Sequence, residues 1–598
     1  MEIKRVFDIL DNLKISSSKN DILNAKEKQP SQQDGKKWVN YSVTDFAFNA
    51  NSVSSALLYL GLKSGDSVAI MASNMPQWNF VDYGSQQVAM PTIPIFPTIS
   101  GNDLKYILNH SEAKIIFISE KSAYQKLVSM EEELPHLKYV FSFLPIAEVK
   151  PFSEFLEIGN KNSALDTIEQ IKNGIKEEDL LTILYTSGTT GQPKGVMITH
   201  KNMISNVLIC KDIAPFRIEW RALSFLPLNH VYERFLNTLY LYQNVSIYYA
   251  ESIETIGDNC RELQPHIFVA VPRVLERVLE RIISAGEKLE GFKKKIFNWS
   301  VSIAQRYELD GANGPWYEFQ RKICEILVYK KWRAAVGGKV EVIVSGGAAL
   351  NPKIERIFAC AGLKVLQGYG LTETCVVVAV NRLGPGNSMF GTVGKVVENS
   401  EVKIAEEDGE ILMRGPSLMK GYYKNPEATA EAIDKDGWFH TGDIGTIING
   451  NFLKITDRKK EIFKSSAGKY ISPVAIENKL KESKYIEHCM VIGEGQKYAS
   501  ALIIPSISNF KEHFNKNNID WPGNDVLHEH EEIKKIINAH IKEVNASLAP
   551  YEQLKRSQLI KGNWTVETGE ITPKLSLKRK NIAEQNKEII IKIFGEGE

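Results

Sequence analysis

Two stretches of this sequence alternate short apolar runs with longer helix-like segments, and this alternation limits the folds open to the chain. In residues 66–120 the runs SVAIMA, TIPIFP and KIIFIS have the length and composition of strands, and helix-like segments separate them. Residues 339–369 repeat the pattern, with VEVIVSGG and KVLQGYG on either side of NPKIERIFACAG. Parallel strands need crossover helices of this kind, so both stretches predict an α/β fold with largely parallel sheets.

The length and the charge balance bound the number of domains and the classes of partner. A chain of 598 residues is too long for one hydrophobic core, so we expect several lobes. Its 73 Lys and Arg residues nearly balance its 72 Asp and Glu residues, which gives no reason to expect a nucleic-acid partner. Six widely spaced cysteines without a CxxC pair favour a reducing, cytoplasmic location over a disulfide framework or a structural zinc site.

No segment of the sequence predicts a signal peptide or a membrane span. The N-terminal segment lacks a long apolar core, and no apolar run approaches the length of a bilayer-crossing helix. One face of an N-terminal helix is apolar, and we expect this face to pack on the protein's own body. Its residues are Ile3, Val6, Phe7, Leu10 and Leu13. Peripheral contact with the inner face of the membrane and the oligomeric state stay open.

The later part of the chain changes in character. Residues 274–335 are charged and helical, which is typical of an insertion outside a sheet. From about residue 401 the sequence consists of short β-like pieces with turns. The charge run TDRKKE at 456–461 marks a hinge, which a smaller α+β domain follows. We therefore divide the chain into a large N-terminal domain (1–456), a hinge (457–460) and a small C-terminal domain (461–598).

The segment YTSGTTGQPKGV, residues 185–196, carries the strongest chemical signal. Gly188 and Gly191 let backbone N–H groups wrap an anion, and Lys194 adds a positive charge. Further donors are the hydroxyls of Thr186, Ser187, Thr189 and Thr190. The spacing is not that of the NTPase P-loop, in which Ser or Thr follows Gly-Lys. A tight turn would explain the glycines alone, but glycines, hydroxyls and a lysine together favour a phosphate cradle.

Further segments carry groups suited to a nucleotide. In QGYGLTET, residues 367–374, Glu373 offers a hard oxygen for Mg²⁺ and Thr372 can donate to a phosphate. The turn TGD presents Asp443, whose carboxylate is suited to accept from ribose hydroxyls. The remaining charged segments are Asp457-Arg458 and TGEITPKLSLKRK, residues 568–580.

In this order, and over nearly the whole chain, these segments resemble the superfamily of acyl-CoA synthetases, peptide-synthetase adenylation domains and luciferases. The resemblance implies a large domain of layered α/β subdomains with a small β-barrel-like part, and a small mobile α+β domain. It also implies that ATP and Mg²⁺ are used to convert a carboxylic acid into an acyl-AMP, which reacts with CoA to form an acyl-CoA thioester. The expected small-molecule partners are therefore a fatty acid, ATP and CoA.

The resemblance also assigns roles to single residues. Thr186 and Glu373 would bind Mg²⁺, and Lys574 would catalyse adenylation from the mobile domain. Lys460 would lie at the pivot, and rotation there would exchange Lys574 for the segment that admits the CoA thiol. The residues implied for that second step are Gly468 and Lys469. The residues implied for ATP are Ser187, Gly188, Thr189, Thr190, Gly191, Lys194, Gly346, Gly347, Ala348, Gln367, Gly368, Tyr369, Gly370, Thr372, Asp443 and Arg458.

Two segments resemble the long-chain fatty acyl-CoA synthetase branch, FLPLNHVYER (225–234) and AVPRVLERV (270–278). In the first, His230 would lie near the carboxylate of the acid, and a structural histidine is the alternative. Its apolar neighbours would line a tunnel for medium- to long-chain acids, or would form the core of one helix. Many members of the branch have another residue where Lys574 stands, so Lys578 is the alternative catalytic lysine. A solvated basic tail is the third interpretation of this segment.

Three rival functions share these motifs. A fatty acyl-AMP ligase would deliver the acyl group to a carrier protein, and a luciferase-like oxygenase would also form an adenylate. A catalytically inactive fatty-acid-binding protein belongs to a different class, and the intact glycine-rich loop, Glu373, Asp443 and Lys574 argue against it. We expect a long-chain fatty acid–CoA ligase that uses ATP, Mg²⁺ and CoA.

Overall fold

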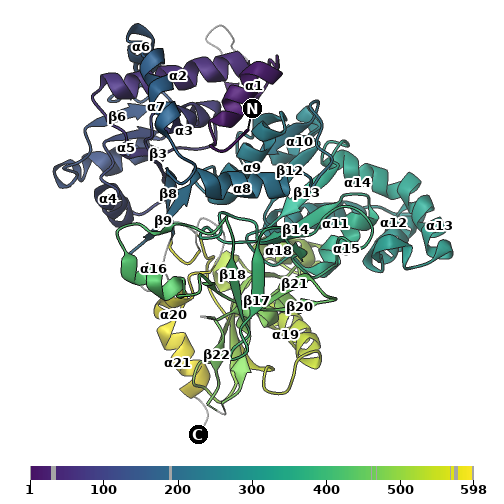
Figure 1. Ribbon diagram of the computed structural model, residues 1–598. Helices are drawn as coiled ribbons and strands as arrows, with labels where there is room; N and C mark the ends of the chain where they lie inside the picture. Colours follow the sequence, from purple (N-terminus) through teal and green to yellow (C-terminus); the bar gives the residue numbers. More distant parts are fainter. Residues whose placement is uncertain are drawn as a thin grey trace. The chain divides into compact units, whose positions relative to one another are not determined.

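The computed structural model describes residues 2–27, 36–186, 192–252, 254–459, 461–466, 468–565, 568–571 and 577–595. Contacts within the chain divide it into two compact units (Figure 1). Unit 1 holds residues 1–403, 412–441 and 447–454, and unit 2 holds 404–411, 442–446 and 455–598. None of the described helices has the length and apolar character that a bilayer crossing needs. The domain limits given above stay a prediction, and Lys460 of the hinge lies outside the described residues.

An eight-stranded sheet forms one layer of unit 1, with the strand order β19-β9-β8-β4-β3-β5-β6-β7. Neighbouring strands from β3 to β8 pair in parallel, and β9 and β19 join by antiparallel pairing. The strands are β3 (Val68–Met71), β4 (Thr92–Pro94), β5 (Ile115–Ile118), β6 (Tyr139–Ser142), β7 (Lys150–Pro151), β8 (Leu180–Thr186), β9 (Lys194–Thr199) and β19 (Gly421–Tyr422). The helices of this part are α2 (Val43–Tyr59), α3 (Pro76–Gln87), α4 (Gly101–His110), α5 (Lys121–Val128), α6 (Phe152–Lys161) and α7 (Leu165–Gly174). The strand–helix–strand pattern predicted for residues 66–120 is confirmed.

The second sheet of unit 1 is larger and also largely parallel. Strands β1, β11, β10, β12, β13 and β14 are parallel neighbours in that order, and β2 joins antiparallel to β1. These strands are β1 (Leu23–Glu27), β2 (Lys37–Tyr41), β10 (Arg221–Ser224), β11 (Ser246–Tyr249), β12 (Ile267–Ala270), β13 (Val342–Ser345) and β14 (Val365–Tyr369). The associated helices are α8 (His200–Cys210), α9 (Val231–Tyr242), α10 (Ile256–Leu263) and α15 (Pro352–Cys360). The predicted strand–helix–strand unit at 339–369 is therefore present, and the apolar face of its helix is buried.

The part expected to be β-barrel-like does not close into a barrel in the described residues. Beyond β14 the large sheet continues through antiparallel pairing of β15 (Ala379–Val380) and β16 (Lys395–Val396). Strand β21 (Phe452–Arg458) then pairs with β16 and extends the open sheet. The other elements here are β17 (Glu401–Ile404), β18 (Glu410–Arg414), α16 (Pro426–Ala432) and β20 (Phe439–Ile448). The α/β class with a large and a small part is confirmed.

The predicted insertion at 274–335 consists of helices, and no described residue in it belongs to a strand. Its helices are α11 (Pro272–Glu287), α12 (Gly291–Gln305), α13 (Pro315–Cys324) and α14 (Lys330–Ala335), with a π-helical turn, η3 (Glu325–Tyr329), between the last two. They share a hydrophobic core with the helices beside β12 and β13, to which Phe297, Tyr317 and Trp332 contribute. The insertion is thus a helical lobe at the edge of unit 1 (Figure 1).

The N-terminal helix packs on the protein's own body, as predicted. In and just before α1 (Asp8–Ser16), Val6, Phe7, Leu10 and Leu13 are at most 3% exposed, and Ile3 packs against the same core. The main-chain N–H of Val6 donates to Nδ1 of His200 at 3.1 Å, which ties the helix to α8.

Unit 2 is built on a three-stranded sheet in the order β24-β25-β26. Strands β24 (Ile486–Ile492) and β25 (Ala499–Pro505) are antiparallel, and β26 (Leu554–Leu559) joins β25 in parallel. The helices are α17 (Pro473–Leu480), α18 (Ile507–Lys516), α19 (Glu531–Ala546), α20 (Arg579–Gln585) and α21 (Lys587–Gly595). The predicted helix at 473–483 and the paired strands after it are confirmed.

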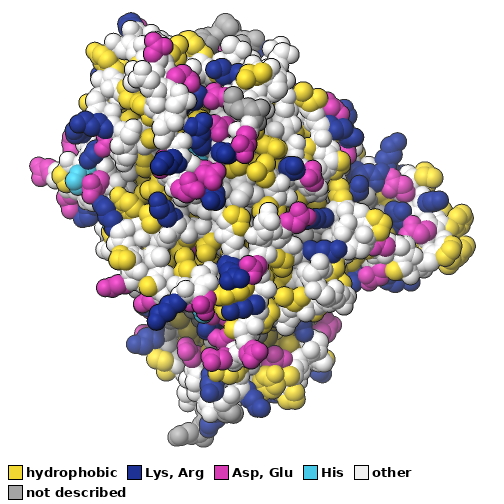
Figure 2. All heavy atoms as spheres, in the orientation of Figure 1, with side chains coloured by type: hydrophobic (Ala, Val, Ile, Leu, Met, Phe, Trp, Pro, Cys, Tyr) yellow, Lys and Arg dark blue, Asp and Glu magenta, His cyan; other side chains and the backbone are white. Residues whose placement is uncertain are grey.

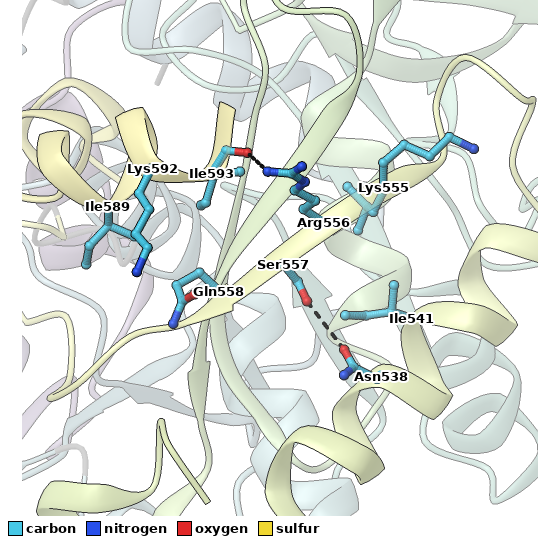
Figure 3. A pocket seen from close by; sticks show the side chains of 10 residues that line it. Asn538, Ile541, Lys555, Arg556, Ser557, Gln558, Ile589, Lys592 and Ile593 are labelled. Carbon is cyan, nitrogen blue, oxygen red and sulfur yellow. Dashed lines mark hydrogen bonds between the residues drawn. The ribbon is translucent and has the colours of Figure 1, made fainter. Parts of the chain in front are cut away.

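A cavity of about 530 Å³ lies between β26, α19 and α21 in unit 2 (Figure 3). Arg556 donates to the main-chain oxygen of Ile593 across it at 2.6 Å, and Lys592 and Gln558 lie on the same side (Figure 3). None of the site residues expected from the sequence lines this cavity.

A buried ion pair joins the helices of the two sheets in unit 1. Arg234 on α9 contacts Asp82 on α3, with Nη2–Oδ1 at 2.6 Å and Nε–Oδ2 at 3.2 Å. Both side chains are only 3% exposed. The hydroxyl of Thr92 donates to the same carboxylate at 2.8 Å, and the guanidinium lies over the ring of Trp78. This pair fixes α9, which follows β10 of the large sheet, against the layer that contains β4 and α3.

Removing one partner of this pair leaves the other charge buried without compensation. We expect Arg234→Met to lower the free energy of unfolding of unit 1 by about 3–5 kcal/mol. Urea unfolding followed by tryptophan fluorescence measures this. The double variant Asp82→Leu/Arg234→Met should lose clearly less than Arg234→Met alone. As the control, Arg414→Ala removes an exposed bidentate contact with Glu401 and should lose less than about 1 kcal/mol; equal losses in both single variants would contradict this account.

Candidate functional site

The glycine-rich loop is closed at its base by a cross-strand pair. Thr186 ends β8 and Lys194 begins β9, and the two residues are partners in the antiparallel ladder. Residues directly opposite each other in such a ladder project to the same face of the sheet. The loop therefore leaves the sheet with a hydroxyl and an ammonium group side by side. The remaining loop residues lie outside the described residues, and their roles stay predictions: Ser187, Gly188, Thr189, Thr190 and Gly191.

Tyr422 brings the loop and the predicted metal ligand together. Its strand, β19, pairs with β9, and the ammonium of Lys194 lies 4.9 Å from the centre of the Tyr422 ring. The Tyr422 hydroxyl donates to Oε1 of Glu373 at 3.0 Å. Burial, followed by the nearby carboxylate of Glu373, raises the pKa of Tyr422, so the hydroxyl keeps its proton and remains a donor. No sequence pattern indicated Tyr422, which lies in the segment GYYKNP, residues 421–426.

Glu373 sits in a turn that packing holds in a strained shape. Val376 has φ 98°, a conformation that β-branched residues rarely adopt. A Cβ added at Gly370 would lie 1.1 Å from the main-chain oxygen of Val376, so only glycine fits there. The hydroxyl of Thr374 accepts from the N–H of Leu371 at 2.9 Å and so bridges the turn. The main-chain oxygen of Glu373 itself accepts from the N–H of Met419 at 2.7 Å, next to β19.

The predicted adenine segments meet at the carboxyl ends of two parallel strands. Gly346, Gly347 and Ala348 follow β13, and Gln367, Gly368, Tyr369 and Gly370 end or follow β14. The register pairs Ser345 with Gln367, so the two segments are adjacent. Gly346 is buried, Gly347 and Ala348 are exposed, and Thr372 is buried. Ligands of α/β proteins gather at such strand ends.

Buried polar atoms without protein partners line the same edge. Among the described residues, none forms a hydrogen bond with Oγ of Ser345, Oε1 of Gln367 or the hydroxyl of Tyr232. A Cβ added at Gly346 would lie 3.0 Å from that hydroxyl, so Tyr232 reaches from α9 to this edge. Because buried polar atoms nearly always have partners, these three atoms are consistent with a polar ligand or ordered water at this edge.

His230 has the structural role that was the alternative to a place beside the acid. It is the N-cap of α9, and its Nδ1 accepts from the N–H of Tyr232 at 3.1 Å. The neutral ring then carries its proton on Nε2. The apolar residues around it are core side chains, with Leu228, Phe235 and Leu236 at most 1% exposed. This burial agrees with the core interpretation, and the position of His230 near a substrate carboxylate stays a prediction.

Asp443 and Arg458 lie together in unit 2. Nε of Arg458 is 3.3 Å from Oδ1 of Asp443, which is 4% exposed at the residue level. The next residue, Lys459, forms ion pairs with Asp408 at 2.6 Å and with Glu410 at 2.8 Å. The two residues expected for ribose are therefore neighbours, and ribose binding stays a prediction.

The segments predicted for the two catalytic steps also belong to unit 2. Gly468, with φ 76°, and Lys469 lie in the tight connection between β22 (Phe463–Lys464) and β23 (Tyr470–Ile471). Lys574 lies outside the described residues, and the flanking residues Ile571 and Leu577 form an antiparallel bridge. The alternative, Lys578, precedes α20, and its N–H donates to the main-chain oxygen of Glu570 at 2.7 Å. The choice between the two lysines stays a prediction.

The donor set near Tyr422 suits Mg²⁺ shared with a bound phosphate. Within the described ranges no three His, Cys, Asp or Glu side chains converge as a metal cage. Glu373 supplies one carboxylate and Thr186 one hydroxyl, both hard oxygen donors. Mg²⁺ is commonly held by one or two carboxylates together with substrate phosphates, so the residues present fit the ion.

Comparison with known families decides the class of this chain. The model of the AMP-binding enzyme family matches residues 24–423, and the model of the AMP-binding enzyme C-terminal domain matches residues 461–598. The chain belongs to the AMP-binding enzyme family. The long-chain-fatty-acid–CoA ligase FadD15 of Mycobacterium tuberculosis is 31% identical over 561 residues, which cover 92% of this chain and 91% of the relative. Human long-chain-fatty-acid–CoA ligase 1 is 29% identical over 580 residues, 91% of this chain and 80% of the relative. This AMP-binding enzyme is thus an acyl-CoA synthetase of the adenylate-forming superfamily.

Solved structures share the fold of this AMP-binding enzyme. A Mycobacterium tuberculosis fatty acyl CoA synthetase superposes with a TM-score of 0.62 at 20% identity and covers 98% of this chain and 99% of its own. The A domain of a carboxylic acid reductase from Segniliparus rugosus, in complex with AMP and a co-purified carboxylic acid, reaches a TM-score of 0.75 at 18% identity. Its match covers 99% of this chain and 94% of that domain.

The contact between Tyr422 and Glu373 can be tested by removing one hydroxyl. A hydrogen bond to a charged group contributes about 1.5–3 kcal/mol, so Tyr422→Phe should slow ATP–pyrophosphate exchange at limiting Mg²⁺ by about tenfold to a hundredfold. Tyr423→Phe, at the neighbouring position, is the matched control and should leave the exchange rate and its Mg²⁺ dependence unchanged. Equal behaviour of the two variants, with unchanged melting temperatures, would show that Tyr422 does not position Glu373.

Proposed function

We propose that this enzyme activates medium- to long-chain fatty acids, by forming an acyl-AMP from the acid and ATP and then an acyl-CoA from the acyl-AMP and CoA. The observation that carries the proposal is the meeting of two predicted motifs, the phosphate loop and the segment of Glu373, around Tyr422. Thr186 and Lys194 close the phosphate loop, and Glu373 reaches the same tyrosine from the carboxyl edge of β14. The named activities of the long-chain-fatty-acid–CoA ligases that the chain resembles support the acyl substrate and the thiol acceptor.

The first half-reaction joins two anions. A carboxylate oxygen attacks the α-phosphorus of ATP, and the bond from that phosphorus to the pyrophosphate oxygen breaks. Positive charge must neutralise the phosphoryl oxygens while the reactants stay in line. Lys194 supplies such charge at the base of the loop, and Lys574 would supply it from unit 2. Mg²⁺, held by Glu373 and Thr186 with the triphosphate, would add further neutralising charge when bound.

The second half-reaction exchanges the nucleotide for a thiol. The sulfur of CoA attacks the acyl carbon as the thiol gives up its proton, and the bond from that carbon to the AMP oxygen breaks. No side chain of the enzyme becomes acylated. We infer that unit 2 turns at 457–460, around Lys460, between the two steps. The turn would replace the Lys574 loop by the connection that carries Gly468 and Lys469, where the missing side chain of glycine leaves room for pantetheine.

Two alternatives make different predictions. A fatty acyl-AMP ligase would release acyl-AMP to a carrier protein and would not respond to CoA. A catalytically inactive fatty-acid-binding protein would show no exchange of pyrophosphate into ATP. The names of the relatives favour CoA as the acceptor, and the contact of Glu373 with Tyr422 beside Lys194 favours an intact phosphate site.

The acid preference tests the proposed function directly. Each buried CH₂ contributes about 0.8 kcal/mol, so a tunnel should raise kcat/KM steadily from butyrate to about dodecanoate or beyond. AMP release measured over acids from acetate to oleate, with and without CoA, checks this. Aromatic acids such as coumarate serve as the comparison class. A maximum at acetate or at an aromatic acid would contradict the substrate, while CoA-independent turnover would favour the acyl-AMP ligase.

Substitutions in the two segments of unit 2, at Lys574 and at Gly468, should slow different half-reactions. Lys574→Ala should slow acyl-AMP formation by about 10²–10³, the usual scale for a positioned charge, and should leave thiolysis of supplied acyl-AMP nearly unchanged. Lys578→Ala is its control. Gly468→Leu should slow thiolysis only, with Gly495→Leu as the control because Gly495 also has a positive φ and open surroundings. If Lys574→Ala and Gly468→Leu impair the same half-reaction, the proposed rotation of unit 2 is contradicted.

A further inference from the structure

The outermost helix of the insertion exposes a stripe of large apolar side chains. Trp316 is 72% exposed, Phe319 53% and Ile326 77%. Leu327, at 41%, and the half-buried Ile323 complete the stripe. The first members follow each other at intervals of three or four residues along α13 and η3, which is the spacing of one helical face. We name these five residues the apolar stripe.

The apolar stripe is not a core face that lacks its packing partner. The opposite face of the same helix is buried, and Tyr317, Cys324, Tyr329 and Trp332 belong to the core of the insertion. The hydroxyls of Tyr317 and Tyr329 donate to main-chain oxygens of α12, Tyr317 at 2.5 Å and Tyr329 at 2.7 Å. The helix is therefore fixed by one face and presents the other to solvent.

Two aromatic rings form the beginning of the apolar stripe. The rings of Trp316 and Phe319 are stacked, with centroids 5.6 Å apart. Figure 2 shows hydrophobic side chains gathered at the end of the lobe that carries α12 and α13, with Lys and Arg side chains near them. The stripe thus lies on a ridge at the edge of unit 1 and not in a groove.

The surroundings of the apolar stripe are basic, although the whole chain is nearly neutral. Between residues 291 and 335 the sequence has nine Lys and Arg residues and four Asp and Glu residues, against a net charge of +1 for the chain. Lys322, Lys330 and Lys331 are exposed beside or at the end of the stripe. The four acids are engaged, Glu308 by Arg356, Asp310 by the N–H of Gly386, Glu318 by Arg321 and Glu325 by Arg333.

We propose that the apolar stripe and its lysines dock on the surface of an anionic lipid bilayer. Tryptophan and phenylalanine partition into the headgroup region, and a helix with an apolar face and a basic rim lies in that plane. Lysine side chains can extend along the helix so that their ammonium groups reach anionic headgroups. A ridge of exposed apolar side chains can enter a deformable lipid surface, whereas a protein partner would need a matching groove. The proposal does not rest on the proposed function.

Co-sedimentation of the full-length protein with vesicles tests the docking. The wild type should bind vesicles that contain phosphatidylglycerol, and this binding should weaken at high salt. Its binding to vesicles of phosphatidylcholine alone should be weak. Trp316→Glu/Ile326→Glu should weaken binding by about tenfold or more, because two apolar anchors become charged. The matched control is Tyr59→Glu/Ile218→Glu, since these residues of unit 1 are 61% and 56% exposed. It should bind like the wild type.

A charge variant and a measurement of mass complete the test. Lys322→Glu/Lys330→Glu should remove the preference for phosphatidylglycerol, and Lys138→Glu/Lys176→Glu should retain it. Melting temperatures equal to that of the wild type show that the variants fold. Equal binding of stripe and control variants, or no binding of the wild type, would overturn the proposal. The proposal would also be overturned if light scattering showed a dimeric wild type and a monomeric Trp316→Glu/Ile326→Glu variant that still binds vesicles. The apolar stripe would then be a contact between two copies.

Discussion

The ion pair of Arg234 with Asp82 is the constraint on which the position of the site depends. It joins α9, which follows a strand of the large sheet, to α3 beside the eight-stranded sheet. Two charges that are each 3% exposed are tolerated only in a close, hydrogen-bonded geometry. The phosphate-loop base belongs to one sheet, and the carboxyl ends of β13 and β14 belong to the other. A site assembled from both sheets needs the two sheets in a fixed relative position. The ion pair contributes to this because sliding of α9 along α3 would separate the two charges.

The first turn of α9 shows how one motif serves several structural purposes. His230 caps the helix, Tyr232 places its hydroxyl beside Gly346, and Arg234 forms the ion pair. Between them Glu233 is 1% exposed, and burial raises its pKa to about 8, so the carboxyl group is mostly protonated at neutral pH. The amide of Asn237 donates to it at 3.3 Å. The segment that resembles an acyl pocket thus also connects the two sheets. His230 and Arg234 bond to the protein itself, whereas the hydroxyl of Tyr232 has no partner among the described residues.

The sequence predicted those parts of the fold that depend on local patterns. Continuous apolar runs predicted β3, β5 and β13, which are buried along their whole length, and the recurring apolar face predicted α15. It did not predict Tyr422, because β19 has two residues and no period, and its pairing with β9 is a long-range contact. Nor could it predict the turn at Val376, whose positive φ is imposed by neighbours such as Gly370 and Thr374. For the same reason the sequence could not decide whether the apolar residues around His230 face a ligand or the core.

The two loops predicted to act on the phosphates are anchored in the same way. One is closed by the pair Thr186 and Lys194, and the other by the bridge between Ile571 and Leu577. Just beyond that bridge, the guanidinium of Arg579 forms two hydrogen bonds to the carboxylate of Glu477 on α17, at 2.8 and 2.7 Å. Holding both ends of a loop removes conformational freedom during folding, so less remains to be lost when the loop closes on an anion. In the proposed function Thr186 and Lys194 therefore act twice, as the pair that anchors the loop and as groups that contact Mg²⁺ and the phosphates, whereas Ile571 and Leu577 act as an anchor only.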